Sequence, residues 1–380
     1  MAFNKKILIG TVGESYAHRR NFTDLNKDKV IFKRAYDLLT IYRFFMRKPF
    51  FHRLFASSKL KNMHYETNIF NYDMYHFFNT VSNSSKPWFS TFEDMIPRWG
   101  YTKEVVVMLE SDSCKKLIAL SQNAYDMQSR RLKKIFPRSH DNLMSKTIVL
   151  HPPQQQHISS WNEKGLSASG TIKFCFVGNL FFRKGGMQIL EVFEELINEG
   201  YDISLVIISK MEYGDFVSKT TLEDLKRAKD IINNNSLITW HENLANSEVL
   251  KIMKNIHVGL LPSFADTYGY VVLEFQSFAC PVITTNISAL PEINDNMKGW
   301  IIDVEKNEEN FAITNTPTDL IKLEKTVRKS LKNIIKEIVQ NPNEIIIKGN
   351  FSLQQLEIKH NPKRHGDFLY KLYKENLGGH

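Results

Sequence analysis

The strongest constraint on the fold is a regular alternation of short apolar runs and amphipathic segments in the second half of the 380-residue chain. The apolar runs lie at 174–178, 203–208, 237–240, 256–261, 282–285 and 300–302. Helical patterns separate most of them, as in 189–197, where apolar residues share one helical face. This alternation predicts a parallel sheet with helices on both faces. Ligands of such sheets bind beyond the carboxyl ends of the strands.

The first half of the chain shows a looser pattern of the same kind. Strands are expected at 6–10, 69–78, 88–92, 117–121 and 147–150, and helices at 32–55 and 122–136. Residues 151–170 are rich in Pro, Gln, Ser and Gly and are interpreted as a linker. Residues 317–340 and 362–377 are expected to be helices. A chain of this length is long enough for two domains of ~100–200 residues each.

The formal charge of +9 is concentrated in the first half. Residues 1–150 hold 25 Lys and Arg against 13 Asp and Glu, and the remainder holds 25 against 28. A basic surface favours an anionic partner, such as a phospholipid surface, a lipid-phosphate acceptor or nucleic acid, although it also arises as a plain soluble face. Residues 42–61 interleave cations with phenylalanines, which suits an interfacial segment on anionic lipid or a core helix. No motif for base readout is present, so nucleic acid is not expected.

Cysteine usage and the N-terminus bear on the compartment. Three cysteines, Cys114, Cys175 and Cys280, are not at metal-ligand spacing, and an odd number without a framework indicates a reducing compartment. The sequence shows no secretory signal and no run of ~18 apolar residues. We therefore expect a cytoplasmic protein, which can attach peripherally to the inner face of the membrane.

The most informative segment is 262–293, which follows an apolar run. A polar loop with Gly269 leads into a helix that is expected to begin near Tyr270 and to stop at Pro281. Free N–H groups and the positive dipole end at a helix start suit a diphosphate. Glu274 lies one turn into this helix and can accept hydrogen bonds from a ribose diol, while Asp266 can hold sugar hydroxyls from the other side.

A second segment, 174–190, has complementary chemistry. The apolar run ends at Gly178, and the following loop carries Arg183 and Lys184. Gly185 and Gly186 then open a helix and permit close backbone approach. Two cations at a helix start are typical of a diphosphate site.

Together these segments resemble the donor-site signature of the group 1 (family 4) retaining glycosyltransferases of the GT-B fold. The matching elements are Asp266 and Glu274, separated by seven residues, then Pro281-Val282 and Pro291-Glu292, with the Lys184-Gly185 pair ~80 residues upstream. The family usually has Glu where this chain has Asp266, and often Arg where it has Asn179. The resemblance is closest over 170–300.

The resemblance implies an α/β fold with two Rossmann-like domains whose parallel sheets face a central cleft. Residues 1–155 would form the acceptor-side domain and 156–355 the nucleotide-sugar donor domain, and the helical segment 356–380 would pack back on the N-terminal domain. Lys184, with Arg183 as its partner, would neutralise the donor diphosphate, Asp266 would contact the transferred sugar, and Glu274 would hold the ribose. The remaining donor-binding positions would be Gly13, Gly178, Asn179, Thr267, Tyr268, Gly269 and Tyr270.

One further candidate lies in the N-terminal half. The run 88–92 is followed by Glu93 and Asp94, and many family members have His at the position of Glu93. A carboxylate there can accept the proton of an acceptor hydroxyl, bind sugar, or simply cap a helix. Gly13 matches the family's glycine-rich turn after the first strand.

The implied activity is that of a retaining, hexosyltransferase-type enzyme. It would move a sugar from a nucleoside diphosphate sugar to a glycan or lipid-linked acceptor in surface polysaccharide or glycoconjugate synthesis. No metal or other cofactor is expected, since the sequence has no Asp-x-Asp pair. The alternatives are a non-catalytic nucleotide-sugar-binding scaffold subunit and a nucleotide-sugar epimerase or a phosphorylase of the same fold. The departures at Glu93, Asn179 and Asp266 support the scaffold.

Overall fold

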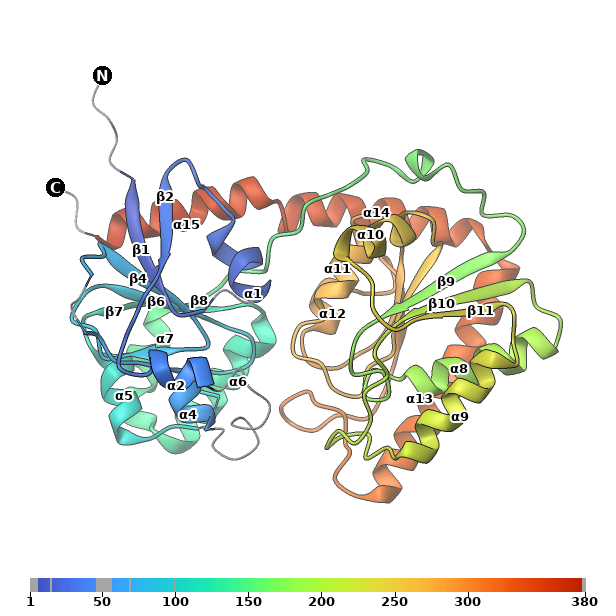
Figure 1. The fold of residues 1–380 in the computed structure, drawn as a ribbon, viewed down its shortest axis with the longest axis horizontal. Coiled ribbons are helices and arrows are strands. Elements are labelled where there is room, and N and C mark those ends of the chain that lie inside the picture. The colour runs from blue at the N-terminus through green and yellow to red at the C-terminus, as the bar shows by residue number, and fades with distance from the viewer. Residues whose placement is uncertain (1–5, 14–15, 46–56, 68–69, 99, 378–380) are drawn as a thin grey trace. The chain divides into compact units, whose positions relative to one another are not determined.

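A computed structural model describes residues 6–13, 16–45, 57–67, 70–98 and 100–377 of the chain (Figure 1). Contacts divide it into two compact units. The N-terminal unit contains Met1–Pro153 and His360–His380, and the C-terminal unit contains Gln154–Lys359. Each unit is built on a six-stranded parallel sheet, so the α/β architecture predicted from the sequence is confirmed. None of the helices among the described residues is long and apolar enough to span a membrane.

The sheet of the C-terminal unit has the strand order β11-β10-β9-β12-β13-β14. Its strands are β9 (Ile172–Val177), β10 (Ile203–Ile208), β11 (Ile238–His241), β12 (Val258–Leu261), β13 (Val282–Thr285) and β14 (Trp300–Ile302). The order reverses direction at β9, because β10 and β12 pair with its two edges. Reversals of this kind leave a crevice for ligands at the carboxyl ends of the strands.

Helices cover both faces of this sheet (Figure 1). They are α8 (Gly186–Asn198), α9 (Leu222–Asn233), α10 (Asn246–Lys254), α11 (Tyr270–Gln276), α12 (Leu290–Ile293), α13 (Pro317–Gln340) and α14 (Asn343–Lys359). α13 packs along α8 and begins with a capping box, in which Thr316 and Asp319 satisfy the first free N–H groups. Its apolar stripe is buried, and Lys332 on the same helix pairs with Glu195 of α8 at 2.5 Å and with Glu199, which directly follows α8, at 2.7 Å.

The N-terminal unit has the strand order β2-β1-β4-β6-β7-β8. The strands are β1 (Ile7–Thr11), β2 (Val30–Arg34), β4 (Met74–Phe78), β6 (Trp88–Phe92), β7 (Cys114–Ala119) and β8 (Thr147–Val149), and β3 (Met63–His64) pairs with β5 (Val81–Ser82) in a small second sheet. The helices of this unit include α1 (Tyr16–His18), α2 (Thr40–Phe45), α4 (Ser58–Lys61), α5 (Lys103–Glu110), α6 (Gln122–Ile135), α7 (His140–Lys146) and α15 (Pro362–Asn376). A large buried core lies around β4 and β6.

The C-terminal helix α15 completes the N-terminal unit. Tyr373 is fully buried, and its hydroxyl hydrogen-bonds Nδ1 of the buried His76 in β4 at 2.6 Å. Nε2 of His76 in turn lies 2.8 Å from Oγ1 of Thr91 in β6. A helix distant in sequence is thereby tied to two strands of the sheet.

Three elements differ from the sequence expectation. The predicted helix 32–55 is wrong at its start, because Val30–Arg34 alternate buried with more exposed residues and pair with β1 as β2; its residues 46–55 lie outside the described residues. The predicted strand 69–78 is shorter, since β4 begins only at Met74. α11 ends at Gln276 rather than at Pro281, because the chain turns at Ala279, where φ is +54°.

Candidate active site

The loop after β9 is shaped by glycines. A Cβ at Gly178 would come within 2.8 Å of Cδ of Lys184, so glycine lets the lysine side chain cross this turn. Gly185 has φ +78°, and a Cβ there would lie 2.4 Å from the carbonyl oxygen of Pro262. The loop 178–185 can therefore lie directly against the loop that follows β12 only because these positions lack side chains.

Hydrogen bonds join these two loops. The backbone N–H of Phe264 donates to the carbonyl of Arg183 at 2.9 Å. Oγ1 of Thr285 donates to the carbonyl of Ser263 at 2.6 Å and ties the second loop to β13. The two segments that were predicted to share one donor site therefore lie in direct contact.

Lys184 and Asp266 meet in this site. Nζ of Lys184 lies 2.7 Å from Oδ2 of Asp266, and their side chains are only 17% and 11% exposed. Such a charge-assisted contact between partly buried groups holds both side chains in one position. It places a cation and a carboxylate next to the start of α8.

The neighbouring predicted residues differ in exposure. Arg183 is half-buried, and its Nε has no hydrogen-bond partner among the described residues. Asn179 is exposed. A buried guanidinium N–H that makes no hydrogen bond is costly. This nitrogen is therefore a donor available to an anion.

The start of α11 presents mainly backbone. Gly269 caps the helix with φ +84°, and a Cβ there would meet Cδ2 of Leu290 at 2.5 Å. The Tyr268 side chain is buried, whereas Thr267 and Tyr270 are half-buried. This loop can therefore offer backbone groups to a ligand at positions 267–270.

Glu274 lies half-buried on α11. Its charge acts on His157, whose pKa is lowered by burial and raised by Glu274, with burial the larger effect. The imidazole of His157 stacks on Phe278 with ring centroids 4.5 Å apart, and its backbone N–H donates to the carbonyl of Ser277. The sequence analysis missed His157, because it lies in the stretch interpreted as a linker and no periodicity marks it.

Two predicted residues lie in the N-terminal unit. Gly13 follows β1 with φ +98°. Glu93 follows β6; its carboxylate pairs with Arg98 at 2.8 Å, and its backbone N–H donates to Oδ1 of Asn79. Asp94 also pairs with Arg98, at 3.0 Å. The sequence analysis did not anticipate Arg98, which holds both carboxylates.

Metal ligands are absent from the described part of the chain, where no group of three His, Cys, Asp or Glu side chains could hold an ion. All three cysteines are buried and free. The site is therefore composed of cations, carboxylates and loop backbone.

Each of the two units has a parallel sheet flanked by helices, and the second unit has a cation–carboxylate site at the ends of its strands. These features define the class: this is an α/β protein of the GT-B fold. Residues 158–338, most of the C-terminal unit, match the family model of the glycosyl transferases group 1. The resemblance predicted from the sequence is confirmed.

Several known proteins are similar to this chain in sequence or in structure. The capsular polysaccharide biosynthesis glycosyltransferase CapM of Staphylococcus aureus is 24% identical over 129 residues, which are 34% of this chain and about a third (32%) of CapM. A glycosyltransferase from Rickettsia africae has a TM-score of 0.61 at 13% identity, over 99% of this chain and 91% of its own. Anabaena HepE in complex with UDP also has a TM-score of 0.61, at 10% identity, over 98% of this chain and 100% of its own.

Proposed function

We propose that this protein transfers a sugar from a nucleoside diphosphate sugar to a glycan or lipid-linked acceptor, with retention at the anomeric carbon. The observation that carries the proposal is the Lys184–Asp266 pair beside the glycine-rich start of α8. Helix starts and cations bind diphosphates, and a carboxylate at the same place can bind sugar hydroxyls. The protein would act in surface polysaccharide or glycoconjugate synthesis. The name of its relative CapM, a capsular polysaccharide biosynthesis glycosyltransferase, supports this role.

In the proposed reaction the bond between the anomeric carbon and the diphosphate oxygen breaks, and the acceptor oxygen forms a new bond to that carbon. Lys184 and Arg183 would stabilise the negative charge that develops on the leaving diphosphate. Asp266 would orient both Lys184 and the sugar, Glu274 would hold the ribose, and the backbone of 267–270 would hold phosphate and sugar. Glu93 is the candidate to accept the acceptor's proton. The site would need no metal.

The experiment compares transfer by the parent protein, Lys184→Ala and the control Lys254→Ala, whose lysine is exposed on α10. UDP-glucose is the first donor to test, because a HepE structure holds it. Lys184→Ala should lower kcat about 10²–10³-fold while the protein remains folded at the assay temperature, and Lys254→Ala should behave as the parent. The anomeric configuration of the product, read by NMR, tests retention.

Equal activity of Lys184→Ala and the parent would contradict the proposal. The second candidate is a non-catalytic scaffold, favoured by the departures at Asn179 and Asp266 and by the Arg98 partner of Glu93. UDP-sugars that raise the unfolding temperature without any turnover on a panel of acceptors would support it. Conversion of the donor to another UDP-sugar without an acceptor would indicate an epimerase.

We also propose that residues 42–61 bind anionic lipid at the inner face of the membrane. Exposed apolar side chains on and beside α2 support this, with Ile41 72% and Phe44 56% exposed. Arg43, however, pairs with the buried Asp37 and donates to the carbonyl of Met63, so its charge is already compensated. The test is therefore to replace Arg47, Lys48 and Arg53 by Glu and measure partition to phosphatidylglycerol vesicles. Unchanged partition would overturn the proposal.

A further inference from the structure

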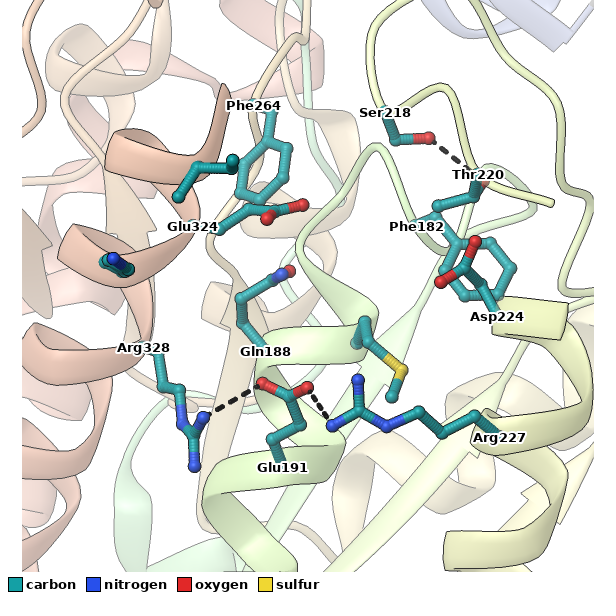
Figure 2. A pocket seen from close by; sticks show the side chains of 13 residues that line it. Phe182, Gln188, Glu191, Ser218, Thr220, Asp224, Arg227, Phe264, Glu324 and Arg328 are labelled. Atoms are coloured by element: carbon teal, nitrogen blue, oxygen red, sulfur yellow. Dashed lines mark hydrogen bonds and ion pairs between the residues drawn. The ribbon is translucent and has the colours of Figure 1, made fainter. Parts of the chain in front are cut away.

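A pocket of about 220 Å³ lies in the C-terminal unit between α8, α9 and α13 (Figure 2). Phe182 and Phe264 form part of its wall, and each belongs to one of the two loops that carry Lys184 and Asp266. Lys184 and Asp266 themselves do not line it. The pocket is therefore distinct from the candidate donor site, although the same two loops build both.

The arginines at this pocket are already paired. Figure 2 shows the carboxylate of Glu191 between Arg227 and Arg328, at 2.6 and 3.6 Å. Arg328 also lies 3.5 Å from Glu195. These cations therefore have their counter-charges within the protein, and an added anion would have to compete with Glu191 and Glu195 for them.

Two acceptors in the pocket lack donors. Gln188 is only 5% exposed, and its Oε1 has no hydrogen-bond partner in the part of the chain that the structure describes. Glu324 is half-buried and makes no ion pair or hydrogen bond with a described residue. In Figure 2 the polar ends of both side chains point toward the same space. Buried acceptors normally have a partner, so the buried Oε1 of Gln188 indicates a missing donor, and the half-buried Glu324 lies beside it in the pocket lining.

Two carboxylates lie near Glu324, and the exposed Lys325 also lines the pocket. Burial raises the pKa of Glu324, and the nearby carboxylates of Glu191 and Asp224 raise it further. A positive group placed here would relieve that repulsion. An organic cation with N–H donors would serve both the carboxylate of Glu324 and the unpaired Oε1 of Gln188.

We propose that this pocket binds the primary ammonium group of a small polar ligand, with Glu324 as its counter-ion and Oε1 of Gln188 as a second acceptor. The volume admits a molecule about the size of one sugar ring, well below a drug-sized ligand. An amino sugar or a simple amino alcohol carries the same group. The proposal does not depend on the donor site or on catalysis.

The experiment measures binding of three probes to the full chain by ligand-observed NMR titration. D-glucosamine and D-glucose differ in one group, amine against hydroxyl, and ethanolamine carries the amine without the ring. We expect glucosamine to bind in about the 1–10 mM range, as suits a ligand of this size, and glucose at least tenfold more weakly. Ethanolamine binding as well as glucosamine would assign the site to simple amines, and weaker binding would assign it to amino sugars.

Variants connect the binding to the pocket. Glu324→Gln and Gln188→Met keep side-chain size and should each weaken glucosamine binding at least tenfold, whereas Glu337→Gln, an exposed acid on the same helix, should not. Stabilisation by UDP should persist in all three, which separates this site from the donor site. Glucosamine binding that is absent from the parent, equal to that of glucose, or unchanged in Glu324→Gln would overturn the proposal.

Discussion

At the scale of single residues, glycines decide how closely the two donor loops approach. Gly185 and Gly200 offer a matched comparison, because both have positive φ, at +78° and +86°. A Cβ at Gly185 would strike the carbonyl of Pro262, whereas a Cβ at Gly200 would meet nothing within 4 Å. The first glycine is needed for contact and for conformation, the second for conformation alone.

We therefore expect Gly200→Ala to cost about 1–2 kcal/mol of unfolding free energy, from left-handed strain alone. Gly185→Ala should cost about 1–3 kcal/mol more, because the methyl group forces the loops apart. It should also weaken UDP binding, whereas Gly200→Ala should leave it intact. Urea unfolding and UDP titration check both effects. Equal costs for the two variants would contradict the close contact with Pro262.

The Lys184–Asp266 pair allows a double-mutant cycle. Removing either partner leaves a partly buried charge unpaired, so the two losses should not add, and we expect a coupling of about 1–3 kcal/mol in unfolding free energy. The exposed pair Lys226–Glu223, at 3.3 Å with side chains 60% and 82% exposed, is the control. Its coupling should not exceed about 0.5 kcal/mol. Additive losses at Lys184 and Asp266 would show that the two groups do not hold each other in solution.

At the scale of elements, periodicity predicted the C-terminal unit well and the N-terminal unit less well. The buried runs became β9 to β14, because strands covered on both faces are apolar throughout. In the N-terminal unit the sequence Val30–Arg34 precedes a basic, aromatic stretch whose composition favoured a helix, and only pairing with β1 reveals the strand.

The candidate site shows the same division. Lys184, Asp266 and Glu274 were predicted from their types, their spacing and the family resemblance, and the structure brings Lys184 and Asp266 together. Arg98 and His157 were not, since their contacts arise from folding and have no local signature. The open acceptor of Gln188 was also beyond sequence reasoning, because one more polar residue in a helix is unremarkable until its burial is known.

One buried hydrogen bond joins α15 to β4. Tyr373→Phe removes the hydroxyl and leaves Nδ1 of His76 without that partner. We expect a loss of about 1–3 kcal/mol in unfolding free energy. Tyr370→Phe, on the same helix but less buried, should change it by no more than about 0.5 kcal/mol. Equal unfolding free energies for the two variants would show that the hydroxyl of Tyr373 does not anchor the helix.

At the scale of the whole molecule, we expect the two units to differ in their response to acid. Burial lowers the pKa of His18, His64 and His365 to about 4, and lowers that of His76 well below its usual value. All four belong to the N-terminal unit. In the C-terminal unit burial lowers the pKa of His157 and His257.

The sign of the effect follows from linkage. Below about pH 6.5, the pKa of a histidine in the unfolded chain, the unfolded chain binds protons, whereas the buried imidazoles of the folded chain stay neutral. The stability that these imidazoles contribute is therefore complete above that pH and falls as the pH drops toward 4. Each histidine that is protonated in the unfolded chain but neutral in the folded chain lowers the unfolding free energy by up to about 1.4 kcal/mol per pH unit as the pH falls through this window. The N-terminal unit should therefore open first on acidification. Hydrogen exchange is measured at pH 7 and pH 5 and corrected for the intrinsic rate. The change from pH 7 to pH 5 should accelerate exchange more in α5, α6 and α15 than in α8 and α13. Equal acceleration in both units would mean that the buried histidines do not control acid stability.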